Sequence, residues 1–473
     1  QAFQAVLIQK PDFVQARAAL GKLPAPVTTE NQKHGTIISP LQTNSSISTK
    51  SKEQITQIFS ETPKIKLLVE GWRGINHSFA LVNQYHLYEW MRSSQLHIYH
   101  RDMPLLFSHW ETNKNRGNTG LPGTYSQRLA QVQHWSGQTY DACFRIYSPV
   151  TLAPDDKHPV STFLVTELGL DETQIAHFRP NLKAYFNMGG NIVTPSHWSK
   201  ERIIEAGIPV EHIHLIPHGV ASNIFHPMHS DERAIHRQRL GFDREAVIFL
   251  NVAAPIWNKG LDLLIQAFVQ CFHQNPHTRL LIKDQQAVYG ISTKDAVLRE
   301  ITLLGESKNE SLLNAIRVIP DLNLLQLREL YCIADYYVAP YRAEGFNLPV
   351  IEALACGTPA IVTEGGATQD FCSKENTLFI DAVPYRNVKI NDRHVNAYQA
   401  PILDSLITHL NVCAQDKPFS ESQRLQSAAS IAKNFTWAKA ADTISRLFTQ
   451  SNSCNTSISQ ITGALYEEPQ YCN

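Results

Sequence analysis

The stretch of sequence that decides the fold is residues 344–371, EGFNLPVIEALACGTPAIVTEGGATQDF. It predicts a loop, a short helix that begins near Pro349, a turn at Gly357 and a buried strand over 360–362. Proline suits the first helical turn because its missing N–H would be unpaired there anyway. Glycine suits the residue that follows a helix. A short apolar strand after such a helix is typical of a parallel sheet that is covered on both faces.

Two carboxylates flank the start of this predicted helix. Glu344 lies on the entering loop, and Glu352 lies about one turn inside the helix. The N–H groups of a helix N-terminus bind anions such as a diphosphate, whereas carboxylates accept hydrogen bonds from sugar hydroxyls. The combination fits a ligand with hydroxyls at both ends and phosphates in the middle, such as a nucleotide-sugar. The alternative is an ordinary turn with two solvated glutamates, which we disfavour because the glycines, the proline and the following strand all agree.

These residues resemble the signature of the family 4 retaining glycosyltransferases, E-G-F-G-L-P-x-x-E-A-x-A-x-G-x-P. The fourth signature residue is the exception, because Asn347 replaces glycine. Asparagine tolerates left-handed backbone angles better than most residues, so the loop can keep its shape. The resemblance covers residues 64–448 and is more specific in their second half. It implies an α/β protein of the GT-B fold, in which two Rossmann-like domains with parallel sheets face an interdomain cleft.

The resemblance also implies a donor site. Lys259, in a Lys-Gly pair ahead of a predicted helix at 261–272, would contact the donor diphosphate. Glu344 would position sugar hydroxyls near the reacting carbon, and Glu352 would bind the ribose. Backbone groups of four consecutive residues would line the sugar pocket: Gly345, Phe346, Asn347 and Leu348. For Lys259 the alternative is a solvated lysine at a helix start.

One cation of the family's donor site is missing. The companion arginine that precedes the lysine by five residues is Ala254 in this chain. Losing one of two cations weakens diphosphate binding unless another residue compensates, and Lys283, after a predicted strand at 279–282, is the candidate.

The first α/β unit predicts a strand at 64–69, a turn and a helix at 79–91. Gly71 and Gly74 in the turn are spaced G-x-x-G, so the dinucleotide fingerprint G-x-G-x-x-G is absent. By resemblance this loop faces the cleft, with Gly74 on the donor side. His77 and Ser78 would lie on the acceptor side. A tight turn without a ligand explains the same residues equally well.

Two further residues are candidate catalytic groups. Arg145 lies on a predicted strand at 141–147 where many relatives carry a cleft histidine, and Glu167 follows a predicted strand at 161–166. Open α/β sheets bind ligands at the carboxyl ends of their strands. The alternative is an ion pair between Arg145 and Glu167.

Composition and the absence of other motifs narrow the function. The chain of 473 residues has 43% hydrophobic and 18% charged residues and a formal net charge of −1, which offers no electrostatic argument for nucleic-acid binding. No run of 18 apolar residues predicts a membrane span, and no secretory signal is recognised. Eight cysteines form no C-x-x-C pair, which favours reduced thiols and a cytoplasmic location. His212 and His214 would share one strand face without a third ligand, so we expect no metal site.

The order of predicted elements gives the domain organisation. The predicted segments are a helical hairpin at 1–23, a linker at 24–61, an N-terminal acceptor domain at 62–227, a C-terminal nucleotide-sugar domain at 228–434, a closing helix at 435–448 that returns to the first domain, and a tail at 449–473. The first segment resembles the end of a tetratricopeptide array, although an unrelated hairpin fits it as well. Residues 92–135 are interpreted as an elaboration of the acceptor side, and residues 382–400 as an insertion or loop.

The preferred function is transfer of a hexosyl group from a nucleotide-sugar to a hydroxyl on a glycan, lipid or protein, with retention of the anomeric configuration. The resemblance implies that neither a divalent metal nor another cofactor is required, because a helix dipole and basic side chains neutralise the leaving diphosphate. One alternative is a nucleotide-sugar epimerase or phosphorylase of the same architecture. Another is a non-catalytic binder of glycans or sugar nucleotides, which could meet a protein partner through its N-terminal helices.

Overall fold

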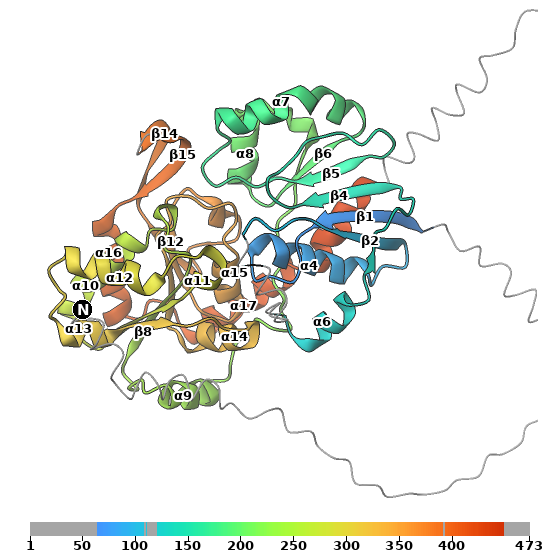
Figure 1. Cartoon of the computed structure of the whole chain (residues 1–473). Helices are drawn as coiled ribbons and strands as arrows, with labels where there is room; N and C mark the ends of the chain where they lie inside the picture. The colour runs from blue at the N-terminus through green and yellow to red at the C-terminus, as the bar shows by residue number, and fades with distance from the viewer. Residues whose placement is uncertain (1–63, 108–109, 111–120, 391–392, 449–473) are drawn as a thin grey trace, which may run out of the picture.

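The computed structural model describes residues 64–107, 110, 121–390 and 393–448. The predicted helical hairpin, the linker and the tail lie outside these residues. Within them, two parallel sheets form two domains, and a two-stranded hairpin projects from the second (Figure 1). No helix among the described residues is both long and apolar enough to cross a bilayer.

The first domain contains a seven-stranded sheet with the order β3-β2-β1-β4-β5-β6-β7, and all its strand pairs are parallel. Its strands are β1 (Ile65–Gly71), β2 (Leu96–Asp102), β3 (Gln133–His134), β4 (Ala142–Ile146), β5 (Val160–Phe163), β6 (Asn191–Thr194) and β7 (Ile213–Leu215). Its helices are α4 (Ser78–Trp90), α6 (Gly123–Leu129), α7 (Glu172–Asn187), α8 (His197–Glu205) and the 3₁₀ turn η1 (Val210–His212). Apolar side chains alternate along the strands between two cores, one on each face of the sheet.

The second domain contains a six-stranded parallel sheet with the order β10-β9-β8-β11-β12-β13. Its strands are β8 (Val247–Val252), β9 (Thr278–Lys283), β10 (Ile316–Ile319), β11 (Tyr336–Ala339), β12 (Ala360–Thr363) and β13 (Thr377–Ile380). Its helices are α9 (Ser230–Arg239), α10 (Leu261–Gln274), α11 (Gln286–Tyr289), α12 (Thr293–Leu303), α13 (Glu310–Ala315), α14 (Leu324–Ile333), α15 (Leu348–Ala355), α16 (Leu403–Gln415) and α17 (Glu421–Asn434), with 3₁₀ turns η2 (Trp257–Lys259) and η3 (Ala367–Asp370).

Helix α15 follows its sequence signature closely. Proline lies in its first turn, and Asn347 at its N-cap adopts the left-handed conformation with φ 72°. Gly357, with φ 77°, follows the helix, and β12 is buried between β11 and β13. Asn347, which replaces the glycine of the signature, therefore adopts the left-handed backbone angle that glycine would supply.

Two segments differ from the sequence interpretation. Residues 92–135 are more than an elaboration, because they contain β2, an inner strand of the first sheet. In β2, LHIYHRD, the apolar residues Leu96 and Ile98 alternate as in a strand. The polar residues that follow, including the fully buried His100, obscure this pattern. Residues 382–400 are an antiparallel hairpin, formed by β14 (Ala382–Ile390) and β15 (Arg393–Pro401).

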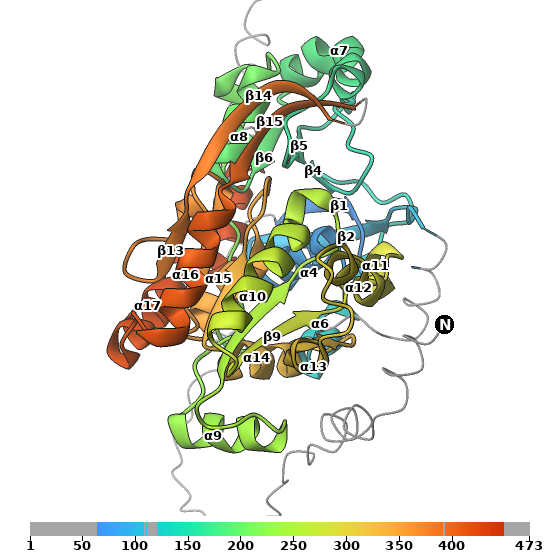
Figure 2. The ribbon, with the colours of Figure 1, turned by 90° about the vertical axis from the view of Figure 1, so that its left-hand side faces the viewer.

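The hairpin extends from the second domain to the first and runs beside α8 (Figure 2). Ala397 packs against Trp198 of α8, and its N–H donates to the carbonyl of Leu168 at 3.0 Å. The guanidinium of Arg386 lies over the ring of Trp198. The hairpin therefore belongs to the contact between the domains.

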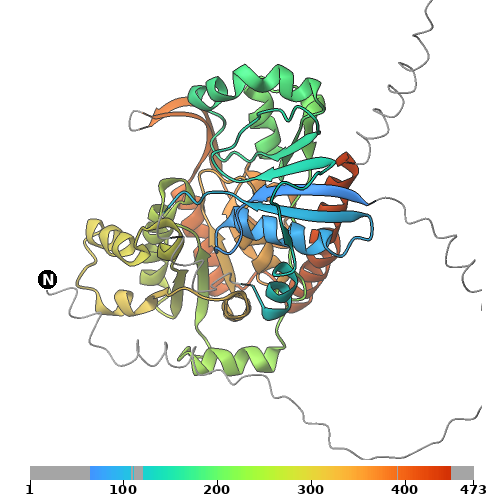
Figure 3. The same cartoon turned by 45° about the vertical axis from the view of Figure 1, so that its right-hand side comes forward.

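The last described helical segment, 437–448, returns to the first domain as expected (Figure 3). The indole N–H of Trp90 in α4 donates to the carbonyl of Ala441 at 3.0 Å. The two crossings of the chain between the domains meet each other, because the N–H of Val220 donates to the carbonyl of Phe435 at 3.0 Å. They are so close that a Cβ on Gly219 would lie 2.1 Å from the backbone nitrogen of Trp437.

Candidate functional site

Three of the predicted site residues meet between the two domains. The ammonium nitrogen of Lys259 lies 2.7 Å from Glu167 Oε1 and 2.9 Å from Glu344 Oε2. Glu167 comes from the first domain, after β5, whereas Lys259 and Glu344 come from loops of the second. Asn258 Nδ2 donates to the other oxygen of Glu167 at 2.6 Å. The cluster thus holds one lysine between two carboxylates, one from each domain.

The turn that carries Lys259 requires glycine at the next position. Gly260 has φ 74°, and a Cβ there would lie 1.9 Å from the carbonyl oxygen of Pro340. The carbonyl of Asn258 accepts hydrogen bonds from the N–H groups of Arg342 and Ala343, at 2.7 and 3.2 Å. These bonds fix the lysine turn against the loop that carries Glu344. Glycine at position 260 is therefore required for bringing the two loops together.

Burial and mutual charge set the protonation of this cluster. Burial raises the pKa of Glu344 to about 7, although Lys259 opposes the shift, and Glu167 adds to it. Burial lowers the pKa of Lys259, but the two neighbouring carboxylates outweigh that effect, so its pKa lies above the ordinary value. The lysine therefore stays charged at neutral pH, as a diphosphate ligand must.

The N-terminus of α15 lies directly after Glu344. Asn347 makes no side-chain hydrogen bond to cap the helix, and no acidic residue lies in the first turn. Ser196 Oγ donates to the carbonyl of Gly345 at 2.6 Å, and a Cβ on that glycine would lie 2.3 Å from Val165 Cγ2. The ring of Phe346 is buried against His218, so this residue can line a sugar pocket only through its backbone. Leu348 is the first residue of the helix.

Glu352 has a protein partner. The hydroxyl of Tyr331 donates to Glu352 Oε2 at 2.9 Å. Burial raises the pKa of Glu352 to about 8, and the hydrogen bond from Tyr331 and the charge of Lys283 oppose that shift. Lys283 is itself buried and pairs with Asp321 at 2.8 Å. The role of Lys283 as a replacement cation stays a prediction, because the charge of Asp321 already balances it.

The raised pKa of Glu352 predicts a pH-dependent stability. The unfolded chain releases this proton near the ordinary value of 4.5, whereas the folded chain keeps it to about 8. The free energy of unfolding therefore falls as pH rises between these values, because the folded state binds the extra proton. Glu352→Gln, which is neutral and similar in size, should reduce this fall by at least about 1 kcal/mol. Urea unfolding of both proteins at pH 5 and pH 8 measures it; parallel losses in the two proteins would contradict the assignment.

The loop after β1 has a clear structural role. Gly74 has φ 80°, and its N–H donates to Gln84 Oε1 at 3.1 Å. His77 caps α4 by accepting from the N–H of Phe79 at 3.2 Å, and burial lowers the pKa of His77 to about 4. Ser78 is exposed at the first position of α4. The tight turn accounts for Gly74 and His77, while acceptor contacts by His77 and Ser78 stay predictions.

Tyr289 of α11 and Asn258 were not recognised from the sequence. Burial raises the pKa of Tyr289, Lys259 opposes the shift, and Glu167 and Glu344 add to it, so this tyrosine lies beside the cluster. Its ring also approaches His77 at 6.1 Å between centroids. Neither residue had a sequence signal of its own, although the position of Asn258 directly before Lys-Gly could have identified it.

The alternative ion pair between Arg145 and Glu167 is wrong. Arg145 Nε pairs instead with Glu70 Oε2 at 3.0 Å, and Arg101 pairs with the other oxygen of Glu70. Glu70, Arg101 and Arg145 are register neighbours on β1, β2 and β4, so the pairing follows from the sheet. The contacts of Arg145 therefore lie within the first domain, and its assignment as a catalytic group has no support from the cluster around Lys259.

The two histidines predicted to share a strand face do not converge. His212 belongs to η1 and stacks on Phe186 at 4.2 Å, whereas His214 in β7 contacts Asn191 Oδ1 at 2.9 Å. Among the residues that the structure describes, no group of three or more His, Cys, Asp or Glu side chains is placed to hold a metal ion.

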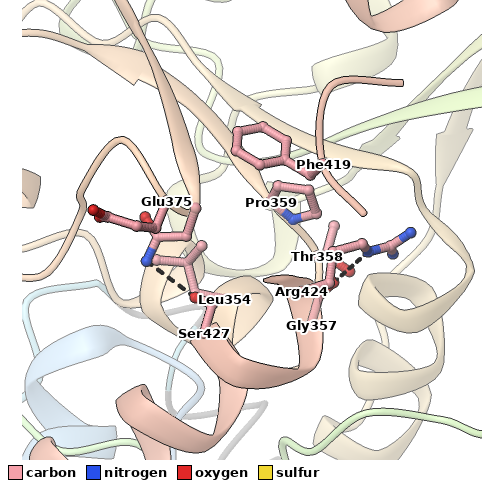
Figure 4. Close-up of a pocket in the computed structure, with 9 residues that line it drawn as sticks. Leu354, Gly357, Thr358, Pro359, Glu375, Phe419, Arg424 and Ser427 are labelled. Carbon is pink, nitrogen blue, oxygen red and sulfur yellow. Dashed lines mark hydrogen bonds between the residues drawn. The ribbon is translucent and has the colours of Figure 1, made fainter. Parts of the chain in front are cut away.

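A small pocket lies at the other end of α15, between that helix and α17 (Figure 4). Arg424 donates to the carbonyl of Gly357 at 2.7 Å, and Asn376 donates to Ser427 at 3.0 Å. These polar lining groups thus form hydrogen bonds with one another. Thr358 Oγ1 is also paired, because it donates to the carbonyl of Tyr331. The pocket therefore fits a packing defect between helices rather than a ligand site.

Comparisons with known proteins agree with this geometry. Residues 232–384 match the family described as glycosyl transferases group 1. This part of the chain is similar to a group 1 glycosyltransferase domain. The group 1 domain contains Lys259, Glu344 and Glu352, whereas Glu167 lies outside it.

Curated relatives match over part of their length. The chain is 33% identical over 184 residues to mannosylfructose-phosphate synthase of Agrobacterium fabrum, which spans 38% of each protein. It is 30% identical over 156 residues to D-inositol 3-phosphate glycosyltransferase of Segniliparus rotundus, which spans 33% of this chain and 32% of that enzyme. The matches thus cover about a third to two fifths of these relatives.

Solved structures show the fold of the whole described region. Anabaena HepE in complex with UDP and glucose superposes with a TM-score of 0.59 at 15% identity, covering 82% of this chain and 100% of that one. Sucrose-phosphate synthase from Thermosynechococcus elongatus superposes with a TM-score of 0.55 at 15% identity, covering 83% and 100%. The group 1 domain is therefore the second half of a GT-B fold, as the sequence predicted.

Proposed function

We propose that this protein transfers a hexosyl group from a nucleotide-sugar to a hydroxyl acceptor with retention of the anomeric configuration. The observation that carries the proposal is the contact of Lys259 with Glu344, on the short loop that leads into α15, whose N-terminus has no side-chain cap. A fixed cation, a helix N-terminus and a carboxylate are thereby adjacent, and they match a diphosphate joined to a sugar. Matches to named glycosyltransferases and to a fold solved with UDP support the choice of donor.

Each residue has a distinct part in this proposal. Lys259 and the α15 N-terminus bind the diphosphate and stabilise the charge that develops when it leaves. Glu344 accepts hydrogen bonds from sugar hydroxyls beside the reacting carbon. Glu352, with one oxygen held by Tyr331, binds the ribose with the other. The acceptor is a glycan, lipid or protein hydroxyl that enters from the first domain.

Screening the purified chain against nucleotide-sugars tests the proposal. UDP-, GDP- and ADP-hexoses are incubated with and without a library of hydroxyl acceptors, and products are detected by mass spectrometry and NMR. Donor-dependent glycosylation with a retained anomeric configuration supports transfer. Conversion of the donor to its epimer would instead identify an epimerase, and tight binding without turnover would identify a binding protein.

The six described cysteines are unpaired and buried, which supports a cytoplasmic location for this activity.

Activity is expected to survive complete removal of divalent ions. In the proposed mechanism Lys259 and the helix N-terminus supply the positive charge that a metal supplies in other transferases. The measurement is the initial rate after dialysis against EDTA, compared with the rate after Mg²⁺ or Mn²⁺ is restored, and the two should agree within about twofold. A rate that vanishes with EDTA and returns with either ion would overturn this part of the proposal.

A further inference from the structure

Glu167 occupies the donor groups that a diphosphate would need in order to bind at Lys259. Its two carboxylate oxygens lie 2.7 Å from the Lys259 ammonium and 2.6 Å from Asn258 Nδ2. A phosphate also presents two acceptor oxygens on one anionic group, at a spacing that can meet adjacent donors. An anion that binds Lys259 therefore competes with Glu167 for the same donors.

The two carboxylates on Lys259 differ in their freedom to leave. Glu344 belongs to the same domain as the lysine and its side chain is 11% exposed, whereas the Glu167 side chain is 41% exposed. Glu167 lies on the first domain, where its carbonyl accepts from the indole N–H of Trp198 at 2.8 Å. Movement between the domains carries Glu167 away from Lys259 but leaves Glu344 in place.

We propose that Glu167 is a built-in competitor of the donor diphosphate and that its contact with Lys259 holds the cleft closed until an anion displaces it. This inference rests on the proposed function, because it takes Lys259 as the diphosphate ligand. It assigns Glu167 a regulatory part in donor entry in place of the catalytic part expected from the sequence. Donor binding then requires breaking an ion pair between the domains, which lowers the apparent affinity.

A matched control exists elsewhere in the contact between the domains. Asp370 of η3 accepts from the backbone N–H of His197 at 2.9 Å and approaches the His197 ring at 3.1 Å. Asp370→Asn removes the same charge and weakens the same interface as Glu167→Gln, but its contacts are with His197 rather than with Lys259. It separates competition at the lysine from a general loosening of the domains.

The test is calorimetric titration of the full chain with UDP, GDP and ADP. For the nucleoside diphosphate that binds, Glu167→Gln should tighten binding about tenfold, since a charge-assisted contact no longer has to be broken. Asp370→Asn should change it by less than about twofold. The gain should disappear when Lys259→Met is added to Glu167→Gln. Glu167→Asp, whose shorter carboxylate retracts from both donors, provides a second variant and should also bind more tightly than wild type.

Each other outcome counts against the inference. Equal or weaker binding by both Glu167 variants, when wild type binds the nucleotide, overturns it and leaves the proposed function standing. An equal gain in Asp370→Asn overturns it as well, because the effect would then come from general opening. If no variant and no wild-type protein binds any of the three nucleotides, the proposed function fails, and this inference fails with it.

Discussion

Replacing Glu344 with glutamine is expected to lower kcat about a hundredfold, with little change in thermal unfolding. In the proposed mechanism the anomeric carbon becomes positive as the diphosphate leaves, and a buried carboxylate beside it interacts more strongly in that state than in the ground state. Removing one such preorganised interaction costs roughly 10²–10³ in kcat. Glutamine keeps the size of the side chain and its hydrogen-bonding oxygen but loses the charge. Steady-state kinetics on a donor–acceptor pair found by screening measures the effect.

Glu352→Gln is the matched control for that experiment. It makes the same substitution eight residues away, at a side chain that is proposed to hold the ribose and that already accepts from Tyr331. Its main effect should be a higher KM for the donor, with kcat within a few-fold of wild type. If both variants show the same kinetic defect, or if both unfold early, the separate roles of the two glutamates are wrong.

Lys259→Met is expected to weaken binding of the nucleoside diphosphate by about 10- to 100-fold. A charge-assisted hydrogen bond contributes roughly 1.5–3 kcal/mol, which corresponds to that range. Calorimetry on the folded variant measures it. Unchanged affinity would remove Lys259 from the donor site.

The burial of Lys259 between two carboxylates calls for a second variant. Removing the lysine leaves Glu344 buried without its cation, which by itself destabilises the loop. In the double variant Lys259→Met, Glu344→Gln both groups are neutral, so that source of damage is absent. The loss of affinity should persist in the double variant. Recovery to wild-type affinity would show that the single variant acted through distortion of the loop rather than through a lost contact with the ligand.

The sequence predicted the elements whose local conformation is set by neighbouring residues in the chain. Helix α15, its left-handed N-cap and the strand after Gly357 follow from proline, asparagine and glycine at fixed spacing. The inner strand β2 was missed because His100 is polar yet fully buried, so the apolar alternation is broken where the fold buries a polar residue. Local patterns report burial only when the buried side chains are apolar.

The contacts of the candidate site depend on information that the sequence does not contain locally. Arg145 was considered as a partner of Glu167, but strand register places Glu70 beside it on the adjacent strand. Glu167 meets Lys259, 92 residues away, because the two domains approach each other there. The residue types at the site could be predicted, whereas their pairing required the arrangement of the domains.

The two adjacent crossings of the chain constrain how the cleft can open. A single linker would let the domains swivel and twist freely, but here the backbone at Val220 is hydrogen-bonded to the backbone at Phe435. Two crossings joined by a hydrogen bond form a natural hinge, so we expect relative motion of the domains to be mainly a rotation about this point. The absence of a side chain at Gly219 allows this close approach, since any Cβ there would collide with the backbone at Trp437, where the last helical segment begins. We therefore expect the opening between the domains to be governed by these backbone crossings, whose residues differ from those proposed to bind the donor.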